Sequence, residues 1–302
     1  MKIVYFGTPE FAVCGLDSLV KSEHEVLGVV TSTDKPTGRK KNINPVKEYA
    51  EKNGLTIYQP ENLKNPEFIE KLRKLEADIF VVIAFRMLPE VIWRMPKLGT
   101  INIHASLLPK YRGAAPIQWS IIRGEKMTGL TSFFLRHEID TGDIIKQIEV
   151  SIGDGDTFGS LHDKLMEVSG EFLLGTLKDI EDGTVKSIPQ DSSLASSAPK
   201  IYRETGRIDW EKTGREINNL IRGLSPYPGA WTIIDGKVIK IFKASVLPVY
   251  YDKTPPGTIE TDRGLLHIKT ADNILSVLEL QEEGKRRMTT AEYLRGNNLK
   301  PL

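Results

Sequence analysis

Short apolar runs alternate with amphipathic segments along the first third of the chain. Residues 2–6 are a run of β-branched and aromatic residues that ends at Gly7, and residues 11–20 repeat apolar positions at helical spacing. Further apolar runs lie at residues 26–30, 79–84 and 99–103, with helical patterns around residues 46–52 and 66–75 between them. Strands and helices that alternate at this length predict parallel strands joined by crossovers. We therefore expect an α/β fold with a doubly wound, mostly parallel sheet.

The pattern then changes from alternating strands and helices to strand next to strand. Two strand-like runs at residues 129–135 and 143–150 flank a polar turn, which predicts an antiparallel addition to the sheet. Apolar positions on one face predict a long helix over residues 158–180. Residues 183–205 are rich in Ser, Pro and Ala and show little periodicity, so we expect a linker there. The first domain is predicted to comprise residues 1–182, directly before this linker.

Residues 206–302 have the pattern of a second, smaller domain. A helical pattern over residues 217–224 is followed by short strand-like runs, and Asp235-Gly236 between two of them is a signal for a two-residue hairpin turn. A final helix is expected to start at Thr289, where Glu292 completes a capping box. Several short strands and turns in this length predict a small, closed or partly closed β-barrel of the oligonucleotide-binding (OB) type.

Composition narrows the class of protein. The chain has 302 residues, of which 40% are hydrophobic and 27% charged, values typical of a globular protein. No run approaches the ~18 consecutive apolar residues that a membrane-spanning helix needs, and the amino terminus lacks the pattern of a secretory signal. Cys14 is the only cysteine, which excludes an internal disulfide. We therefore expect a cytoplasmic protein with no membrane contact, and a monomer is the default expectation.

Two polar side chains fall on one face at the end of a predicted central strand. Asn102 and His104 alternate with Ile101 and Ile103, so the two polar side chains point to the same side. An amide and an imidazole placed together could stabilise an oxyanion on a carbonyl group under attack. The other interpretation, a structural pair covered by a loop, is equally compatible with this spacing.

Two further features have a functional and a structural interpretation. Asp140 lies in a turn between two strand-like runs, where it could orient His104 and assist proton transfer, although aspartates in such turns usually cap the turn. The second feature is a basic cluster in a loop containing Pro and Gly, made of Lys35, Arg39, Lys40 and Lys41. Such a cluster could contact phosphates, although solvated loops of this kind are more common.

Motifs of several other enzyme classes are absent from the sequence. There is neither a G-x-G-x-x-G dinucleotide motif nor a P-loop, and Ser106 lacks the G-x-S-x-G context of a serine hydrolase. The histidines other than His104 show no metal-ligand spacing; they are His24, His137, His162 and His267. We expect no metal site.

Several segments together resemble one enzyme family. They are residues 6–12 (FGTPEFA), 34–39 (DKPTGR), 102–109 (NIHASLLP), 112–117 (RGAAPI), 140–143 (DTGD), 207–210 (RIDW) and 284–288 (GKRRM). Within the wider group of 10-formyltetrahydrofolate enzymes, the chain resembles the methionyl-tRNA formyltransferase family over essentially its whole length. This resemblance implies a Rossmann-like formyltransferase domain followed by an OB-like barrel that contacts tRNA.

The resemblance also implies a reaction and the residues that perform it. The α-amine of methionine on initiator tRNA would attack the formyl carbon of 10-formyltetrahydrofolate, the formyl donor and co-substrate. Asn102 and His104 would hold the oxyanion, while Asp140 would orient His104 and assist proton transfer. The residues implied to line the folate site are Phe85, Arg86, Met87, Leu88, Ser106, Leu107, Leu108 and Pro109. Those implied to reach the acceptor end of the tRNA are Lys35, Arg39, Lys40 and Lys41.

Two segments depart from the pattern of the family. Residues 84–89 (AFRMLP) are one residue shorter than the sequence common in the family and are closer to glycinamide ribonucleotide transformylase. The basic loop is also shortened, between Arg39 and Pro45.

Three other hypotheses are compatible with parts of the sequence. Formyl transfer to a small amine such as that of a sugar nucleotide would not need residues 206–302. Hydrolysis of formyltetrahydrofolate would normally come with a regulatory domain before the catalytic one. A non-catalytic nucleic-acid-binding module leaves the polar pair on the central strand unexplained, and the formal net charge of +1 argues against it.

Overall fold

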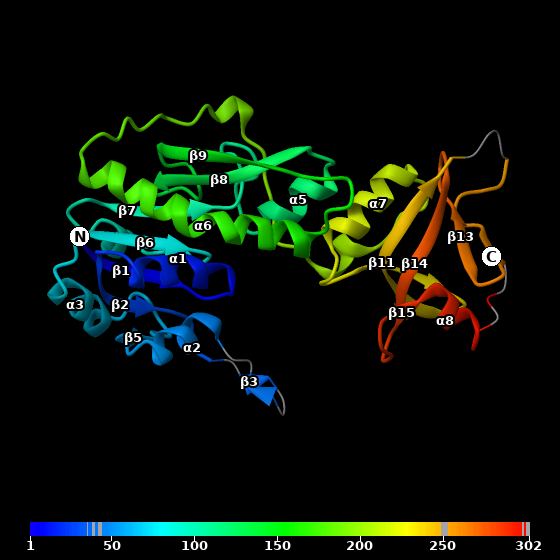
Figure 1. Cartoon of the computed structure of the whole chain (residues 1–302), viewed down its shortest axis with the longest axis horizontal. Coiled ribbons are helices and arrows are strands. Elements are labelled where there is room, and N and C mark those ends of the chain that lie inside the picture. Colours follow the sequence, from blue (N-terminus) through cyan, green and yellow to red (C-terminus); the bar gives the residue numbers. More distant parts are fainter. Residues whose placement is uncertain (35, 38–39, 42–43, 249–252, 298, 300–302) are drawn as a thin grey trace. The chain divides into compact units, whose positions relative to one another are not determined.

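A seven-stranded sheet forms the centre of the first part of the chain in the computed structural model (Figure 1). The structure describes residues 1–34, 36–37, 40–41, 44–248, 253–297 and 299. In sheet order, the strands are β5 (Ile57–Tyr58), β2 (Glu25–Val30), β1 (Lys2–Gly7), β6 (Ile79–Ile83), β7 (Thr100–His104), β8 (Met127–Phe134) and β9 (Ile144–Ser151). Strands β5 to β7 pair in parallel, and β8 runs antiparallel to β7. The predicted α/β fold, with a mostly parallel sheet and an antiparallel addition, is confirmed.

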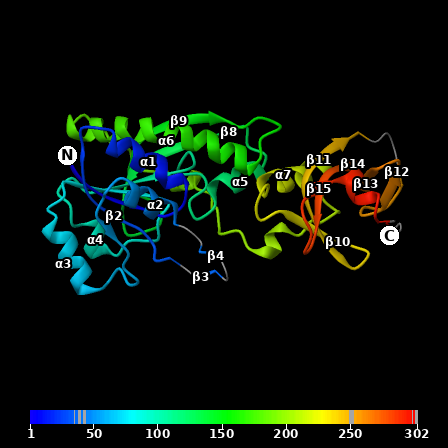
Figure 2. The same cartoon turned by 60° about the horizontal axis from the view of Figure 1, so that its bottom comes forward.

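Helices cover both faces of this sheet (Figure 2). They are α1 (Phe11–Val20), α2 (Pro45–Lys52), α3 (Pro66–Lys74), α4 (Glu90–Trp93) and α6 (Phe158–Glu181). On one face of β1, Val4 and Phe6 pack into a buried cluster with residues of α3 and α4. On the opposite face, the Tyr5 hydroxyl donates to a backbone carbonyl of α1, and a Cβ added at Gly15 of α1 would meet Leu173 of α6 at 3.5 Å. This double cover explains why every residue of β6 is buried.

Local sequence signals fix where two of these helices begin. The Asn44 and Asn65 side chains accept backbone N–H groups of the first turns of α2 and α3, and a proline follows each cap. Asparagine is a preferred N-cap residue, and proline suits the first helical position because it lacks an N–H that would be unpaired there.

The last part of the chain contains an antiparallel sheet (Figure 1). Its strands lie in the order β10 (Ala230–Ile234), β11 (Lys237–Leu247), β14 (Ile274–Glu282), β13 (Leu265–Lys269) and β12 (Ile259–Asp262), and β15 (Met288–Thr289) pairs with β14. The predicted hairpin is confirmed, because Asp235 and Gly236 join β10 to β11 with φ angles of 49° and 73°. A separate β-sheet domain is thus confirmed, whereas its OB type stays a prediction.

The structure contains further helices besides those that cover the first sheet. They are α5 (Pro116–Ile122), α7 (Gly214–Gly223) and α8 (Thr290–Leu294), with the 3-10 helices η1 (Ser192–Leu194) and η2 (Arg203–Gly206). Helix α8 begins with the predicted capping box of Thr289 and Glu292. Among the helices of the described part of the chain, none has the length and apolar character needed to cross a membrane.

Contacts divide the chain into two compact units that alternate along the sequence. The first unit comprises Met1–Gly113, Thr128–Val150 and His162–Ser197, and the second comprises Ala114–Met127, Ser151–Leu161 and Ala198–Leu302. Helix α5 belongs to the second unit, where Ile122 packs against the core of the antiparallel sheet. The division into residues 1–182, 183–205 and 206–302 stays a prediction.

Gly129 of β8 is predicted to be intolerant of any side chain. A Cβ at this position would lie 1.8 Å from the carbonyl oxygen of Ile148 and 2.7 Å from Leu107 Cδ2, so the backbone of β9 would have to move. We expect Gly129→Ala to lower the free energy of unfolding by about 2–4 kcal/mol, measured by urea denaturation. The matched control is Gly175→Ala in α6, where a Cβ meets only Lys146 Nζ at 3.5 Å. The control should gain about 0.5–1 kcal/mol from helix propensity, and equal stability of the two variants would contradict the prediction.

Candidate active site

Strand β7 brings Asn102 and His104 to the edge of the sheet where the parallel strands end. Its residues pair with β6 on one side and with β8 on the other, so the strand is central and its position is fixed. His104 is buried, at 7% exposure, whereas Asn102 is half-buried. Within the described residues, the Asn102 carboxamide has no hydrogen-bond partner. An amide in this state can still donate to a ligand.

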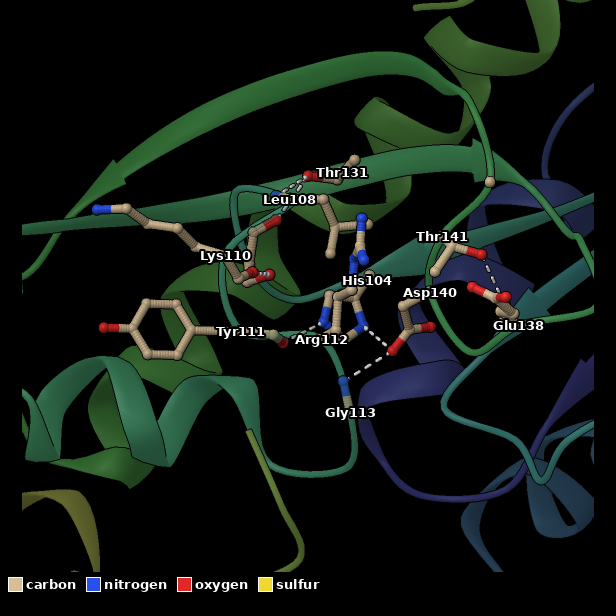
Figure 3. Close-up of polar contacts among 12 residues, drawn as sticks. His104, Leu108, Lys110, Tyr111, Arg112, Gly113, Thr131, Glu138, Asp140 and Thr141 are labelled. Atoms are coloured by element: carbon tan, nitrogen blue, oxygen red, sulfur yellow. Dashed lines mark hydrogen bonds and ion pairs between the residues drawn. The ribbon is translucent and has the colours of Figure 1, made fainter. Parts of the chain in front are cut away.

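The His104 ring is held between a backbone carbonyl and the Asp140 carboxylate (Figure 3). His104 Nε2 lies 2.8 Å from the carbonyl oxygen of Tyr111. Because a carbonyl can only accept, Nε2 carries a proton in this contact. His104 Nδ1 lies 3.7 Å from Asp140 Oδ2, which is longer than a hydrogen bond. The Nδ1 side of the ring therefore has hydrogen-bonding capacity left for a reacting group.

Asp140 is fixed by a backbone contact rather than by the imidazole. Asp140 Oδ2 accepts the N–H of Gly113 at 2.8 Å, so the carboxylate joins its own turn to the loop that follows β7 (Figure 3). The carboxylate is largely buried, at 11% exposure. A buried acceptor that already has one donor and faces an imidazole is suited to stabilise a positive charge on that ring.

Two residues at this site have left-handed backbone conformations. Tyr111 has φ of 63° and Asp140 has φ of 54°. Aspartate tolerates this region well, whereas for tyrosine it is uncommon and costs energy. Tyr111 is held there by packing, at 4% exposure, and by its N–H, which donates to Ser196 Oγ at 2.9 Å. The strained conformation aims the Tyr111 carbonyl at His104.

The segment after His104 is braced by the two antiparallel strands. Thr131 of β8 accepts the Leu108 N–H and donates to the Ser106 carbonyl, and Gln147 of β9 donates to the Leu108 carbonyl at 2.9 Å. Ser106 is fully buried and its hydroxyl donates to the Lys110 carbonyl at 2.7 Å. Of the four residues predicted here, Leu108 is also buried, while Leu107 and Pro109 are half-buried. The predicted folate segment is therefore a rigid loop next to His104.

The second predicted folate segment begins where β6 ends. Ile83 of β6 pairs with Ile103 of β7 in parallel, so residues 84–88 and 105–109 leave the sheet side by side. The side chains of this segment differ in their environment: Phe85 packs edge-on against Phe6, Met87 is 70% exposed, and Leu88 is buried in the core. The two predicted folate segments thus lie at the same edge of the sheet as Asn102 and His104.

Arg86 is directed at a neighbouring loop. Its guanidinium donates to the carbonyls of Pro60 and Glu61 and lies over the Phe85 ring, 5.7 Å from the centroid. These contacts tie the segment after β6 to the loop after β5.

Sequence comparison identifies the family. The formyl transferase family model matches residues 1–177, and the model of the formyl transferase C-terminal domain matches residues 200–298. The methionyl-tRNA formyltransferases of Bacteroides fragilis and Phocaeicola vulgatus are 47% and 49% identical to the chain. The two alignments cover 99% and 98% of this chain and 96% and 95% of those proteins. The chain belongs to the methionyl-tRNA formyltransferase family.

The fold of this methionyl-tRNA formyltransferase family member is shared with formyltransferases that act on other amines. The solved structure of the N-formyltransferase of Helicobacter canadensis, in complex with folinic acid and dTDP-3-aminofucose, has a TM-score of 0.71 to this chain. The match covers 93% of this chain and 99% of that one at 21% identity. Residues 206–302 therefore do not by themselves exclude a sugar-nucleotide substrate, contrary to the expectation from the sequence. The choice between tRNA and a sugar nucleotide as the formyl acceptor therefore depends on the sequence identity to relatives named methionyl-tRNA formyltransferase.

The basic loop lies only partly in the described structure. Lys35 and Arg39 lie outside the described residues. Lys40–Lys41 forms the short strand β4, which pairs antiparallel with β3 (Pro36–Thr37). The described contacts do not bring this loop to Asn102, His104 or Asp140.

Sequence reasoning missed three residues that hold the site together. The Tyr111 carbonyl and the Gly113 N–H act through backbone atoms, for which the residue type gives no signal. Gln190, which contacts the Asp140 turn, lies in the segment predicted to be a linker. The run RGAAPI, which begins at Arg112, was the available signal for the loop that follows β7.

Other candidate chemistry finds no support among the described residues. They contain no group of three or more His, Cys, Asp or Glu side chains that could hold a metal ion. Burial raises the pKa of the Cys14 thiol, so this thiol stays protonated near neutral pH and is a poor nucleophile.

Proposed function

We propose that this protein transfers the formyl group of 10-formyltetrahydrofolate to the free amino group of methionyl initiator tRNA, giving N-formylmethionyl-tRNA for translation initiation. The observation that carries this proposal is the arrangement of an unpartnered Asn102 amide, a held His104 ring and the Asp140 carboxylate at one edge of the sheet. Membership of the methionyl-tRNA formyltransferase family supports the choice of acceptor.

The proposed reaction begins with attack of the methionine α-amine on the formyl carbon. A carbon–nitrogen bond forms, and the carbonyl oxygen becomes an oxyanion that the Asn102 amide holds. His104 can donate to the oxyanion only after its Nδ1 is protonated, because its Nε2 proton is used by the Tyr111 carbonyl. The amine proton passes to the His104 and Asp140 pair. Once His104 Nδ1 has taken it, the carboxylate 3.7 Å away stabilises the positive ring beside the oxyanion. Collapse of the intermediate then breaks the bond between the formyl carbon and N10 of tetrahydrofolate, and the proton passes to that nitrogen.

We also propose that two segments bind the folate. They comprise Phe85, Arg86, Met87 and Leu88 after β6, and Ser106, Leu107, Leu108 and Pro109 after β7. Their common position at the carboxyl ends of parallel strands supports this assignment, because ligands of doubly wound sheets bind there. Backbone groups of the first segment would contact the pterin, since Arg86 is engaged with the carbonyls of Pro60 and Glu61.

The deciding experiment is formyl transfer from 10-formyltetrahydrofolate to methionyl initiator tRNA, with uncharged tRNA as the control. Formylation of the charged tRNA alone is the expected result. Consumption of formyl-folate without a tRNA product would mean that the acceptor is wrong, and sugar-nucleotide amines and water would be tested next. The monomeric state and the cytoplasmic location stay predictions from the sequence.

The basic loop is proposed to contact the acceptor end of the tRNA through Lys35, Arg39, Lys40 and Lys41. We expect Arg39→Ala to weaken tRNA binding and to reduce the slope of log affinity against log salt concentration by about one, because one phosphate contact is lost. Affinity for the folate should not change. Titration of tRNA binding over a range of salt concentrations measures both effects. Lys74→Ala, an exposed cation on α3, is the control, and a changed folate affinity in Arg39→Ala would contradict the assignment.

A further inference from the structure

One side chain from the segment predicted to be a linker joins the two loops of the candidate active site. Gln190 is half-buried in a stretch, residues 186–194, whose other residues are exposed. Its Nε2 donates to the Asp140 carbonyl at 2.9 Å and to the Gly142 carbonyl at 2.8 Å. Its Oε1 accepts from Arg112 Nε at 3.0 Å and from Arg112 Nη2 at 2.7 Å. Both N–H groups of the Gln190 amide and both acceptor positions of its oxygen are therefore used.

The chemistry of the partners fixes the orientation of the Gln190 amide. A guanidinium can only donate, so the atom that faces Arg112 must be the oxygen. Backbone carbonyls can only accept, so the atom that faces Asp140 and Gly142 must be the nitrogen. The contact with a charged guanidinium polarises the amide, which strengthens the two bonds that its nitrogen donates.

Gln190 thus joins the two loops that hold His104, the Arg112 loop and the Asp140 turn. Arg112 lies between Tyr111, whose carbonyl accepts from His104, and Gly113, whose N–H donates to Asp140 (Figure 3). On the other side, the carbonyls that Gln190 binds belong to Asp140, whose backbone is left-handed, and to Gly142. Aspartate tolerates this conformation, and the two hydrogen bonds from Gln190 add to its stability at this place in the chain.

The rest of the segment is attached on both sides of Gln190. Ile188 exchanges two backbone hydrogen bonds of 2.8 Å with Ile144 of β9, and the Arg112 N–H donates to the Ser196 carbonyl at 2.9 Å. Gln190 is therefore presented from a segment that is itself anchored to the sheet and to the loop after β7.

We propose that Gln190 is a positioning residue for formyl transfer: it holds the Asp140 turn against the Arg112 loop, so that the carboxylate and the Tyr111 carbonyl stay aligned on His104. The proposal rests on the proposed function. It makes Gln190, which lies between the attachments at Ile188 and Ser196, part of the scaffold of the active site rather than of a simple connection between domains. Loss of alignment by about 1 Å can reduce turnover about 100-fold, so the effect of Gln190 is expected on kcat.

The test compares Gln190→Ala, Gln190→Glu and the neighbouring control Asp191→Ala. Gln190→Glu keeps an acceptor for Arg112 but sets a carboxylate against two carbonyls. Asp191→Ala removes only the cap of η1, a contact with Ser193. We expect both Gln190 variants to lower kcat about 10- to 100-fold with little change in KM for either substrate, while the control keeps wild-type values. Thermal melting of each variant checks that the fold is intact.

A second readout separates this proposal from the proposed function. Hydrogen–deuterium exchange of a peptide covering residues 137–143 should be faster in both Gln190 variants than in the wild type, and it needs no substrate. Unchanged exchange, unchanged kcat in Gln190→Glu, or an effect confined to KM would each overturn the positioning role. If the wild type forms no formylmethionyl-tRNA, the proposed function fails, and the exchange experiment still decides whether Gln190 holds the turn.

Discussion

Replacement of Asp140 by Asn is expected to lower kcat by about 10²- to 10⁴-fold while the fold and KM for both substrates stay close to those of the wild type. Asparagine has the size of aspartate, tolerates the left-handed conformation observed at this position, and can still accept the Gly113 N–H. What it lacks is the negative charge 3.7 Å from His104 Nδ1. Steady-state kinetics with methionyl-tRNA and 10-formyltetrahydrofolate measure the effect.

The matched control for Asp140 is Glu138→Gln. Glu138 is an exposed acidic residue of the same loop, so the control removes the same charge without touching His104. Its kcat should equal that of the wild type. A turnover of Asp140→Asn close to wild type, or an equal loss in both variants, would remove Asp140 from the proton path.

Replacement of Asn102 by Ala is the second change with a large expected effect. Its carboxamide has no partner among the described residues, so its removal leaves the packing of β7 nearly unchanged. If the amide donates to the oxyanion only when the oxyanion forms, kcat should fall about 10²- to 10³-fold with little change in KM. Asn102→Asp should lose at least as much, because a carboxylate would repel the oxyanion.

The control is Asn53→Ala, which also removes a side-chain amide. Asn53 lies exposed at the end of α2, where its side chain donates to the Tyr49 carbonyl. This variant should keep full turnover. A rise in KM for 10-formyltetrahydrofolate with unchanged kcat in Asn102→Ala would assign Asn102 to ground-state binding instead of catalysis.

The order of strands and helices could be predicted from the sequence because each element carries its own periodicity. The long helix expected over residues 158–180 is α6, Phe158–Glu181, and the hairpin at Asp235-Gly236 has the expected turn. Elements too short to show a period were not predicted. Helix α5, Pro116–Ile122, has seven residues, and β5 has two. Their existence depends on tertiary packing.

The candidate site was predictable only where its residues share one element. Asn102 and His104 lie on the same strand, so alternation alone put them on one face. The contact of His104 with Asp140 joins segments far apart in the chain, so the sequence offered it only as one of two interpretations of Asp140, and the resemblance favoured it. Gln190 could not be found by either route, because the segment around it has no periodicity and its partners are mostly backbone carbonyls.

The interleaving of the two compact units limits how relatives of this enzyme can be recombined. The second unit takes Ala114–Met127 and Ser151–Leu161 from between stretches of the first unit, and Ile122 of α5 packs against its core. A chimaera joined at a single crossover near residue 198 would combine a sheet core from one parent with core-packing residues from the other. To keep native packing, an exchange of the second unit between relatives has to include all three of its stretches of chain. The two units therefore cannot be exchanged as consecutive segments of the sequence.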